Sequence, residues 1–252
     1  MAHPFDLTGK VALVTGANTG LGQGIALALA LAGADIAAAG RTAPVETEAA
    51  VKAAGRRFEA INADFSTTGP IQAAVDETVK RLGRLDILVN NAGIIRRADA
   101  IDFSEDDWDA VMNTNLKSVF FLSQAAARVM LAQGTGGKII NIASMLSFQG
   151  GIRVASYTAS KSGLAGLTHL LANEWAAKGI NVNAIAPGYF ETNNTEALRA
   201  DETRSRDILA RIPAARWGEP ADLGGAAVFL ASSAADYVHG AILPVDGGWL
   251  GR

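Results

Sequence analysis

The chain has 252 residues, 49% of them hydrophobic and 19% charged, so it can bury a large core as one domain. Its formal charge of −3 and the lack of any apolar run near ~18 residues argue against a nucleic-acid-binding surface and against a membrane helix. Cysteine is absent and the first residues lack a signal-peptide pattern, so we expect a cytoplasmic protein without disulfides. The three histidines lack metal-ligand spacing, and we expect no metal.

Apolar runs and amphipathic segments alternate along the chain. The first three apolar runs, at 11–14, 36–39 and 58–63, each precede a segment of helical character, at 21–31, 45–54 and 71–82. Four further strands are predicted at 87–89, 138–142, 181–185 and 242–245. This alternation predicts one α/β domain over residues 1–252, with a doubly wound parallel sheet of about seven strands and helices on both faces. Pro244 cannot donate to a ladder, so the last strand should lie at an edge.

A glycine-rich loop follows the first predicted strand. It reads Thr-Gly-Ala-Asn-Thr-Gly-Leu-Gly from Thr15 to Gly22 and leads into an apolar helix. Glycines let the backbone approach a pyrophosphate, and the helix start offers free amides and a positive dipole end. The loop lacks the Gly-Lys-Ser/Thr of an ATP-binding P-loop, so ATP is disfavoured. The candidate cofactor contacts here are Gly16, Asn18, Thr19, Gly20, Leu21 and Gly22.

A second loop, Asn90–Gly93, follows the fourth predicted strand. In doubly wound sheets, ligands bind outside the carboxyl ends of the strands, where the strand order reverses. The small and amide side chains of this loop suit a backbone pressed against a cofactor. Asn91, Ala92 and Gly93 are therefore candidate contacts.

Tyr157 and Lys161 are a candidate proton-transfer pair. On a helix predicted from 157 to about 177, a four-residue offset places both side chains on one face. A phenol titrates near pH ~10, and a neighbouring cation favours its ionised form. Such spacing is also common on solvated helices, so the pair indicates a catalytic site only in combination with the two loops.

Together these motifs resemble the short-chain dehydrogenase/reductase family from about residue 7 to the C-terminus. The resemblance implies a Rossmann sheet, usually assembled into a homotetramer, and a catalytic tetrad of Asn115, Ser144, Tyr157 and Lys161. Tyr157 would deliver a proton to the developing alkoxide, and Ser144 would stabilise the reacting oxygen. Lys161 would favour the phenolate and hold the ribose hydroxyls. Asn115 would hold a water near that lysine.

The resemblance also implies further cofactor contacts. Pro187, Gly188 and Thr192 would lie beside the nicotinamide, and Asp64 with Phe65 beside the adenine.

The end of the second predicted strand should select between the nicotinamide cofactors. About twenty residues after the glycine loop, a carboxylate would favour NAD and an arginine NADP. The acidic position falls on Gly40, which cannot repel a phosphate, while Arg41 and Thr42 could bind one. We therefore expect NADP(H), with NAD(H) as the alternative. Asp35 lies too early in the strand and is expected to face solvent.

A narrower resemblance within the family concerns the substrate. The segments 94–97, 144–151, 187–189 and 192–195 are similar to dehydrogenases of deoxy-keto sugar acids, which implies hydride transfer between a secondary alcohol and a ketone. A sugar acid needs a cation for its carboxylate and polar groups for its hydroxyls. The candidate contacts are Arg153 and then Arg96 for the carboxylate, with Ser144, Gln149, Tyr189 and Asn193.

Two alternatives remain open. A 3-oxoacyl thioester reductase of the same family would need a basic patch for an acidic carrier protein, to which Arg96, Arg97 and Arg128 could contribute. A catalytically silent nucleotide-sensing protein would keep the loops without hydride transfer. The polar segment 192–216 is predicted to form a lid over the substrate site.

Overall fold

Seven parallel strands form one sheet in the computed structural model, which describes residues 3–252. The strands are β1 Val11–Thr15, β2 Asp35–Gly40, β3 Phe58–Asn62, β4 Ile87–Asn90, β5 Gly137–Ile142, β6 Ile180–Pro187 and β7 Ile242–Val245. Their order is β3-β2-β1-β4-β5-β6-β7, so the direction of winding reverses between β1 and β4. The predictions of a doubly wound sheet and of an edge position for Pro244 are confirmed.

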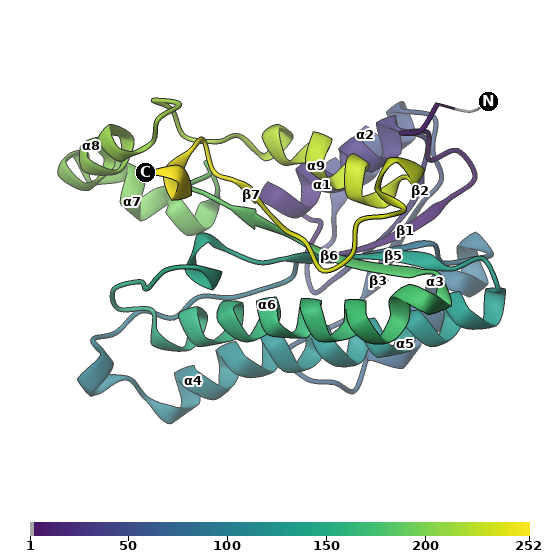
Figure 1. Cartoon of the computed structure of the whole chain (residues 1–252), viewed down its shortest axis with the longest axis horizontal. Helices are drawn as coiled ribbons and strands as arrows, with labels where there is room; N and C mark the ends of the chain where they lie inside the picture. The colour runs from purple at the N-terminus through teal and green to yellow at the C-terminus, as the bar shows by residue number, and fades with distance from the viewer. Residues whose placement is uncertain (1–2) are drawn as a thin grey trace.

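Helices cover both faces of this sheet (Figure 1). The helices are α1 Gly20–Leu31, α2 Val45–Ala53, α3 Ile71–Leu82, α4 Glu105–Met112, α5 Ser118–Gln133, α6 Ala155–Trp175, α7 Glu196–Ala200, α8 Glu202–Arg211 and α9 Gly224–Ala231. In the view of Figure 1, α1, α2 and α9 lie above the sheet, and α3, α5 and α6 lie below it. Within residues 3–252, no helix is both long and apolar enough to cross a membrane.

Side chains of β1 show how the two faces share the core. Val14 packs into the cluster that contains Ile25 of α1, while Leu13 packs into the opposite cluster with Leu122 of α5. Successive side chains of a strand point to opposite faces, so a strand that is covered on both sides needs apolar residues throughout. This requirement explains why the strands read as continuous apolar runs in the sequence.

Asp35 does not face solvent as predicted. The residue is only 5% exposed at the start of β2, and its carboxylate pairs with Arg56 Nη2 at 2.8 Å and Arg57 Nε at 2.7 Å. Burial alone would raise its pKa, but the hydrogen bonds from Arg57 and the charges of both arginines hold it below the ordinary value. The expectation was wrong because the turn into β3 folds back over this end of the sheet.

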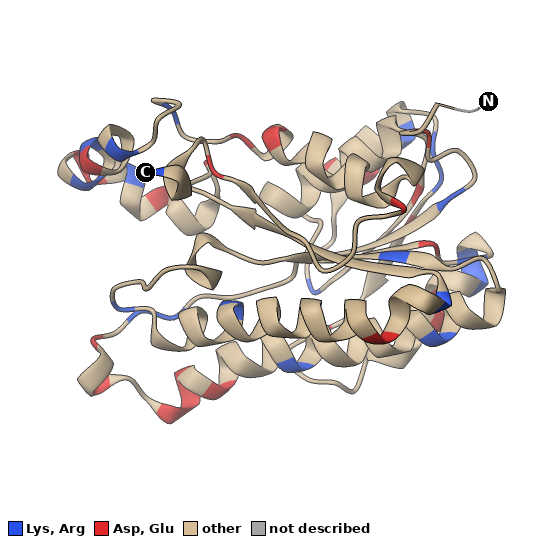
Figure 2. Ribbon diagram, in the orientation of Figure 1, with Lys and Arg blue, Asp and Glu red and all other residues tan. Residues whose placement is uncertain are grey.

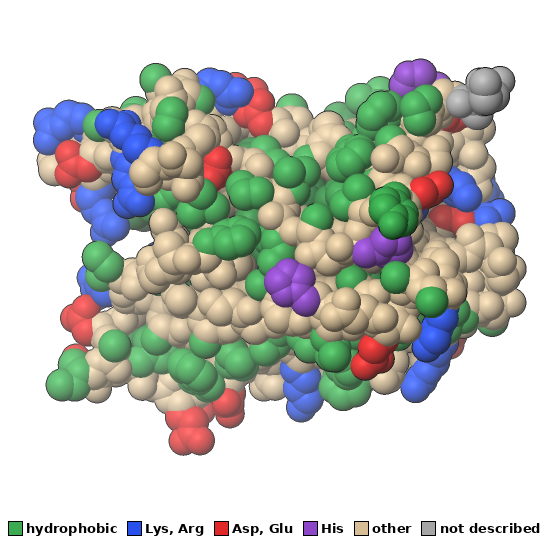
Figure 3. All heavy atoms as spheres, viewed as in Figure 1, with side chains coloured by type: hydrophobic (Ala, Val, Ile, Leu, Met, Phe, Trp, Pro, Cys, Tyr) green, Lys and Arg blue, Asp and Glu red, His purple; other side chains and the backbone are tan. Residues whose placement is uncertain are grey.

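The segment predicted as a lid contains α7 and α8, which project at one end of the molecule (Figure 1). Acidic and basic residues are mixed along these helices (Figure 2), and in the space-filling view basic side chains gather on the projecting lobe (Figure 3). Ile208 of α8 and Ile212, which follows this helix, are buried. The role of the segment as a lid stays a prediction.

Candidate active site

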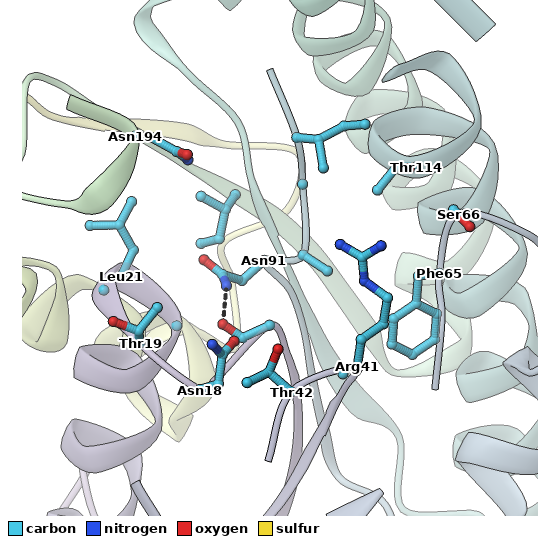
Figure 4. Close-up of a pocket in the computed structure, with 18 of the residues that line it drawn as sticks. Asn18, Thr19, Leu21, Arg41, Thr42, Phe65, Ser66, Asn91, Thr114 and Asn194 are labelled. Carbon is cyan, nitrogen blue, oxygen red and sulfur yellow. Dashed lines mark hydrogen bonds between the residues drawn. The ribbon is translucent and has the colours of Figure 1, made fainter. Parts of the chain in front are cut away.

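A cleft of about 510 Å³ opens at the carboxyl ends of β1 and β4, where the winding of the sheet reverses. The glycine loop, the end of β2, the loop after β3 and the first residues of the 192–216 segment form its walls (Figure 4). Sixteen of the predicted cofactor contacts line it: Gly16, Asn18, Thr19, Gly20, Leu21, Gly22, Arg41, Thr42, Asp64, Phe65, Asn91, Ala92, Gly93, Tyr157, Lys161 and Thr192. The predicted contacts Pro187 and Gly188 lie outside this lining.

Hydrogen bonds join the two cofactor loops into one unit. The Thr15 hydroxyl accepts from the backbone amides of Asn91 and Ala92 at 3.0 and 2.9 Å. In return, Asn91 Nδ2 donates to the carbonyl oxygens of Thr15 and Gly16 at 2.9 and 3.1 Å. A Cβ atom at Gly22 would overlap both Asn91 Nδ2 and the Gly16 carbonyl, so a larger residue cannot fit there. Gly22 is therefore required by the contact between the two loops.

Arg41 and Gly40 form one end of the cleft. The Arg41 side chain extends beside the Phe65 ring (Figure 4), and within residues 3–252 it forms no ion pair. A hydrogen bond from the Ser66 amide chiefly holds the pKa of Asp64 below its usual value, and the charge of Arg41 contributes. A Cβ at Gly40 would meet nothing closer than the Gly16 backbone at 3.9 Å. This end of the cleft therefore offers an unpaired cation and open space.

Thr114 is a cleft residue that sequence reasoning missed. It is 7% exposed, it lines the cleft, and its hydroxyl has no hydrogen-bond partner in the structure. A buried polar group without a partner costs about 1–3 kcal/mol, so Thr114 is a destabilised position in the wall of the cleft. No sequence pattern distinguishes this threonine from a residue of the helix core.

Tyr157 and Lys161 project from the start of α6 into the cleft, as their spacing predicts. Lys161 Nζ donates to the Ile142 carbonyl at 2.5 Å and lies 5.5 Å from the centroid of the Tyr157 ring. Burial lowers the pKa of Lys161 to about 8. Burial raises the pKa of Tyr157, and a hydrogen bond with Ser144 and the charge of Arg97 oppose that rise.

Ser144 and Asn115 approach this pair from two other elements. Ser144 follows the end of β5, and its hydroxyl accepts from the Leu146 amide at 3.1 Å. Asn115 lies in the π-helical turn between α4 and α5 and is fully buried. Its amide oxygen accepts from the Ile94 amide at 2.9 Å, and its Nδ2 donates to the Ile94 carbonyl at 2.8 Å. Asn115 thus fixes the second cofactor loop, and its role as a water ligand stays a prediction.

The arginines predicted to bind a substrate carboxylate are both paired with acids. Arg96 lines the cleft, but its Nε lies 3.1 Å from Asp107. Arg153 lies outside the lining, pairs with Asp99 at 3.1 Å, and has a left-handed φ of 64°. Arg97 has no acidic partner within residues 3–252, and its Nη2 donates to the Asn194 carbonyl at 3.3 Å. Sequence reasoning missed Arg97 because it cannot show which of two adjacent arginines meets a carboxylate.

The remaining predicted substrate contacts divide between the cleft and an aromatic cluster. Asn193 lines the cleft. Tyr189 packs edge-on against Trp217 and Trp249, with ring centroids 5.5 and 4.8 Å away, and Gln149 accepts from the Trp249 indole at 3.3 Å. The structure therefore does not bring Gln149 or Tyr189 to the cleft lining. Nor, within residues 3–252, do three His, Asp or Glu side chains gather to hold a metal.

Comparison with known proteins places this site in a family. A family model described as Enoyl-(Acyl carrier protein) reductase matches residues 16–250. The chain belongs to the short-chain dehydrogenase/reductase family. It is 65% identical over 248 residues to the 2-dehydro-3-deoxy-D-gluconate 5-dehydrogenase of Escherichia coli (strain K12), with 98% of each chain covered. The resemblance predicted from the motifs is confirmed.

Two solved structures are similar to this short-chain dehydrogenase/reductase. One, from Agrobacterium tumefaciens, is provisionally named a 2-deoxy-D-gluconate 3-dehydrogenase and contains NADP; it is 64% identical, covers 99% of this chain and 100% of its own, and has a TM-score of 0.93. The other, from Beutenbergia cavernae, is provisionally named an NAD(P)-dependent gluconate 5-dehydrogenase and contains NADP at low occupancy. It is 50% identical with the same coverage and a TM-score of 0.95.

The burial of Lys161 predicts that the free energy of unfolding of this protein depends on pH. The pKa of Lys161 falls from 10.5 to about 8 on folding, so the folded protein disfavours the charged amine. The stability linked to Lys161 is therefore full above pH 10.5 and is lost as the pH falls through about 8. At pH 7 the loss is on the order of 3 kcal/mol. We expect Lys161→Met to raise the melting temperature at pH 7 by about 5 °C, with the gain shrinking between pH 8 and 10.5.

Thermal unfolding across this pH range checks the prediction, with the exposed Lys178→Met as control. A gain that does not depend on pH, or a lower melting temperature at pH 7, would contradict it.

Proposed function

We propose that this protein interconverts a secondary alcohol and a ketone on a deoxy-keto sugar acid, of the 2-dehydro-3-deoxy-D-gluconate type, with NADP(H). The observation that carries the proposal is the continuity of the cleft. It runs from Arg41 past both cofactor loops to Tyr157 and Lys161, and Arg97, which lies outside the lining, carries a charge that lowers the pKa of Tyr157. A dinucleotide, a proton donor and a substrate anion can all be accommodated in that arrangement. The relatives named for the same sugar acid support it.

The family resemblance implies a role for each member of the tetrad, and the contacts of the site support these roles. The bound cofactor would supply or accept the hydride. Tyr157 transfers the matching proton to or from the substrate oxygen, and Ser144 donates a hydrogen bond to that oxygen as its charge develops. Lys161 would hold the ribose hydroxyls of the cofactor, and Asn115 keeps the second cofactor loop in place through Ile94.

Arg97 is the best candidate to bind the substrate carboxylate. Arg96 and Arg153 already neutralise Asp107 and Asp99, so using either would require an ion pair to break. The Arg97 guanidinium has no such partner within the described chain and lies close enough to affect the phenol of Tyr157. A planar guanidinium can bind a carboxylate through two parallel hydrogen bonds.

Preference for NADP(H) is proposed from the end of β2. Arg41 is unpaired and Gly40 presents no acidic side chain, so a phosphate on the adenosine ribose meets a cation without a repelling charge. The structures from Agrobacterium tumefaciens and Beutenbergia cavernae both contain NADP, which agrees with this preference. NAD(H) remains the alternative cofactor.

Gly40→Asp should reverse the cofactor preference. A Cβ at this position meets only ordinary contacts, so the variant can fold, and its carboxylate would repel the phosphate while binding the ribose hydroxyls of NADH. We expect kcat/KM for NADPH to fall by about 100-fold, equivalent to ~2.8 kcal/mol, and that for NADH to rise. Steady-state kinetics with both cofactors measure this. The uncharged Gly40→Asn is the matched control, and an equal loss in both variants would show that space rather than charge decides.

A substrate screen tests the proposed function itself. Purified protein is assayed with NADPH and NADH against 2-dehydro-3-deoxy-gluconate, related deoxy-keto uronates and acetoacetyl thioesters. We expect turnover of a keto sugar acid. Turnover of thioesters alone would favour the 3-oxoacyl reductase, and cofactor binding without any turnover would favour the nucleotide-sensing protein.

We further infer that the protein is cytoplasmic. We also infer a homotetramer, which is the usual assembly that the family resemblance implies. Large apolar side chains remain exposed on adjoining helices at Trp108, Phe121, Leu131 and Leu170, which is unusual for a surface that stays in water. A mass four times that of the 26.1 kDa chain in light scattering would support the tetramer, and a monomer mass would refute it.

A further inference from the structure

The turn Asp246–Leu250, which follows β7, is held in one conformation by its own hydrogen bonds. Gly247 and Gly248 have left-handed φ angles of 64° and 91°, and the Asp246 carboxylate accepts from the amides of Gly248 at 2.8 Å and Leu250 at 2.9 Å. Within this turn, Trp249 is 5% exposed. The turn therefore places the large side chain of Trp249 in the interior.

Neighbouring side chains lie too close to Gly247 and Gly248, and the turn backbone too close to Gly188, for a Cβ atom to fit without movement. A Cβ at Gly247 would come within 2.9 Å of Ile212, and a Cβ at Gly248 within 2.9 Å of Pro213, at the end of the 192–216 segment. A Cβ at Gly188, after β6, would come within 2.6 Å of the first residue of the turn. Because Cβ atoms do not approach other atoms so closely, the turn has little freedom to shift.

The Trp249 side chain contacts three segments that are distant in sequence. Its indole Nε1 donates to Gln149 Oε1 at 3.3 Å, in the loop between Ser144 and α6. Its ring lies 4.0 Å from the Arg211 guanidinium at the end of α8 and 4.8 Å from the Tyr189 ring after β6. Figure 1 shows this C-terminal segment beside α7 and α8.

These contacts join the loop between Ser144 and Tyr157, the turn after β6 and the end of α8, and they involve no residue of the two cofactor loops. Gln149 follows Ser144 by five residues in the loop that leads to Tyr157. None of Trp249, Gln149 and Tyr189 lines the cleft that holds the cofactor loops. A disturbance at Trp249 should therefore affect the organic substrate and not the dinucleotide.

We propose that Trp249 is a positioning residue for the organic substrate: its indole N–H orients Gln149 and its ring anchors the end of α8, so the substrate walls keep one arrangement. The substrate class in this inference rests on the proposed function. The coupling between Trp249 and Gln149 does not depend on the proposed function.

Trp249→Phe tests the hydrogen bond while it keeps an aromatic ring against Arg211 and Tyr189. We expect KM for the keto sugar acid to rise about fivefold, the usual effect of one lost hydrogen bond, with kcat and the Kd of NADPH unchanged. A merely structural role would instead lower the active fraction and hence kcat. Trp217→Phe is the matched control, because Trp217 packs on Tyr189 without bonding Gln149, and its KM should not change.

A double-mutant cycle with Gln149→Met identifies the path of the effect. If Trp249 acts through Gln149, Trp249→Phe should add nothing to the KM of the Gln149→Met variant. Additive effects, a matching loss of NADPH affinity, or the same KM change in Trp217→Phe would overturn the proposal.

The same variants separate this inference from the proposed function. If the protein turns over another ketone, the sugar-acid assignment fails and the cycle is measured on that ketone. Amide hydrogen exchange of residues 145–153 in the NADPH complex gives a readout that needs no turnover. Faster exchange of this loop in Trp249→Phe is expected, and unchanged exchange would overturn the inference.

Discussion

Replacing Tyr157 by phenylalanine should lower kcat by about 1,000-fold or more while the protein still binds NADPH. The variant loses only the hydroxyl that bonds Ser144, so the ring, its contact with Lys161 and the cofactor loops remain. Transfer of the hydride without a matched proton leaves an alkoxide in a buried site, which is the costly state that the phenol avoids. Single-turnover kinetics and fluorescence titration with NADPH measure the two effects separately.

Tyr237 offers a control for this substitution. Its side chain is almost fully exposed on the surface, so Tyr237→Phe removes a phenol without touching the site. If Tyr157→Phe kept kcat within about tenfold of the wild type, another group would have to supply the proton, and the assigned mechanism would fail.

Replacing Arg97 by methionine should produce the second largest loss. We expect kcat/KM for the keto sugar acid to fall by about 100-fold, because a hydrogen-bonded charge at the substrate carboxylate is lost. An uncharged amide of the same sugar acid should lose far less. Arg96→Met and Arg153→Met rank the three candidates, and a larger loss in Arg153→Met would restore the sequence-based assignment.

Arg97→Met should also change the pH profile. The charge of Arg97 lowers the pKa of Tyr157, so its removal raises that pKa. In the direction of alcohol oxidation the phenolate is the base, and the rate rises as Tyr157 ionises. The midpoint of that rise should therefore move to higher pH in the variant. A midpoint that stays in place would show that Arg97 does not act on Tyr157.

Local patterns were sufficient to predict the elements and the glycine loop, whereas the candidate proton-transfer pair also needed the two cofactor loops and the family motifs. The apolar runs of the strands, the glycine spacing at Gly16–Gly22 and the helical offset of Tyr157 and Lys161 all act over a few residues. Such patterns can be recognised without knowledge of the fold, because the period of a strand or helix and the steric requirements of a tight turn are properties of the chain itself.

Contacts between distant segments could not be predicted in this way. Arg96, Arg97 and Arg153 look alike as sequence, and only the positions of Asp107 and Asp99 in space show which guanidinium is left unpaired. The same limit applies to Asp35, whose burial depends on how the turn into β3 packs.

For this protein, the sequence by itself determined the doubly wound sheet, the two glycine-containing loops and the position of Tyr157 and Lys161 on one helix face, since each follows from short-range periodicity or from a motif. Within residues 3–252, the tertiary structure alone decided which of the three arginines has no acidic partner, that the Thr114 hydroxyl is unpartnered, and that Trp249 meets Gln149 across 100 residues of chain. Those outcomes depend on strand order and packing, which place charges and hydrogen-bonding groups from separate segments within a few ångströms of one another.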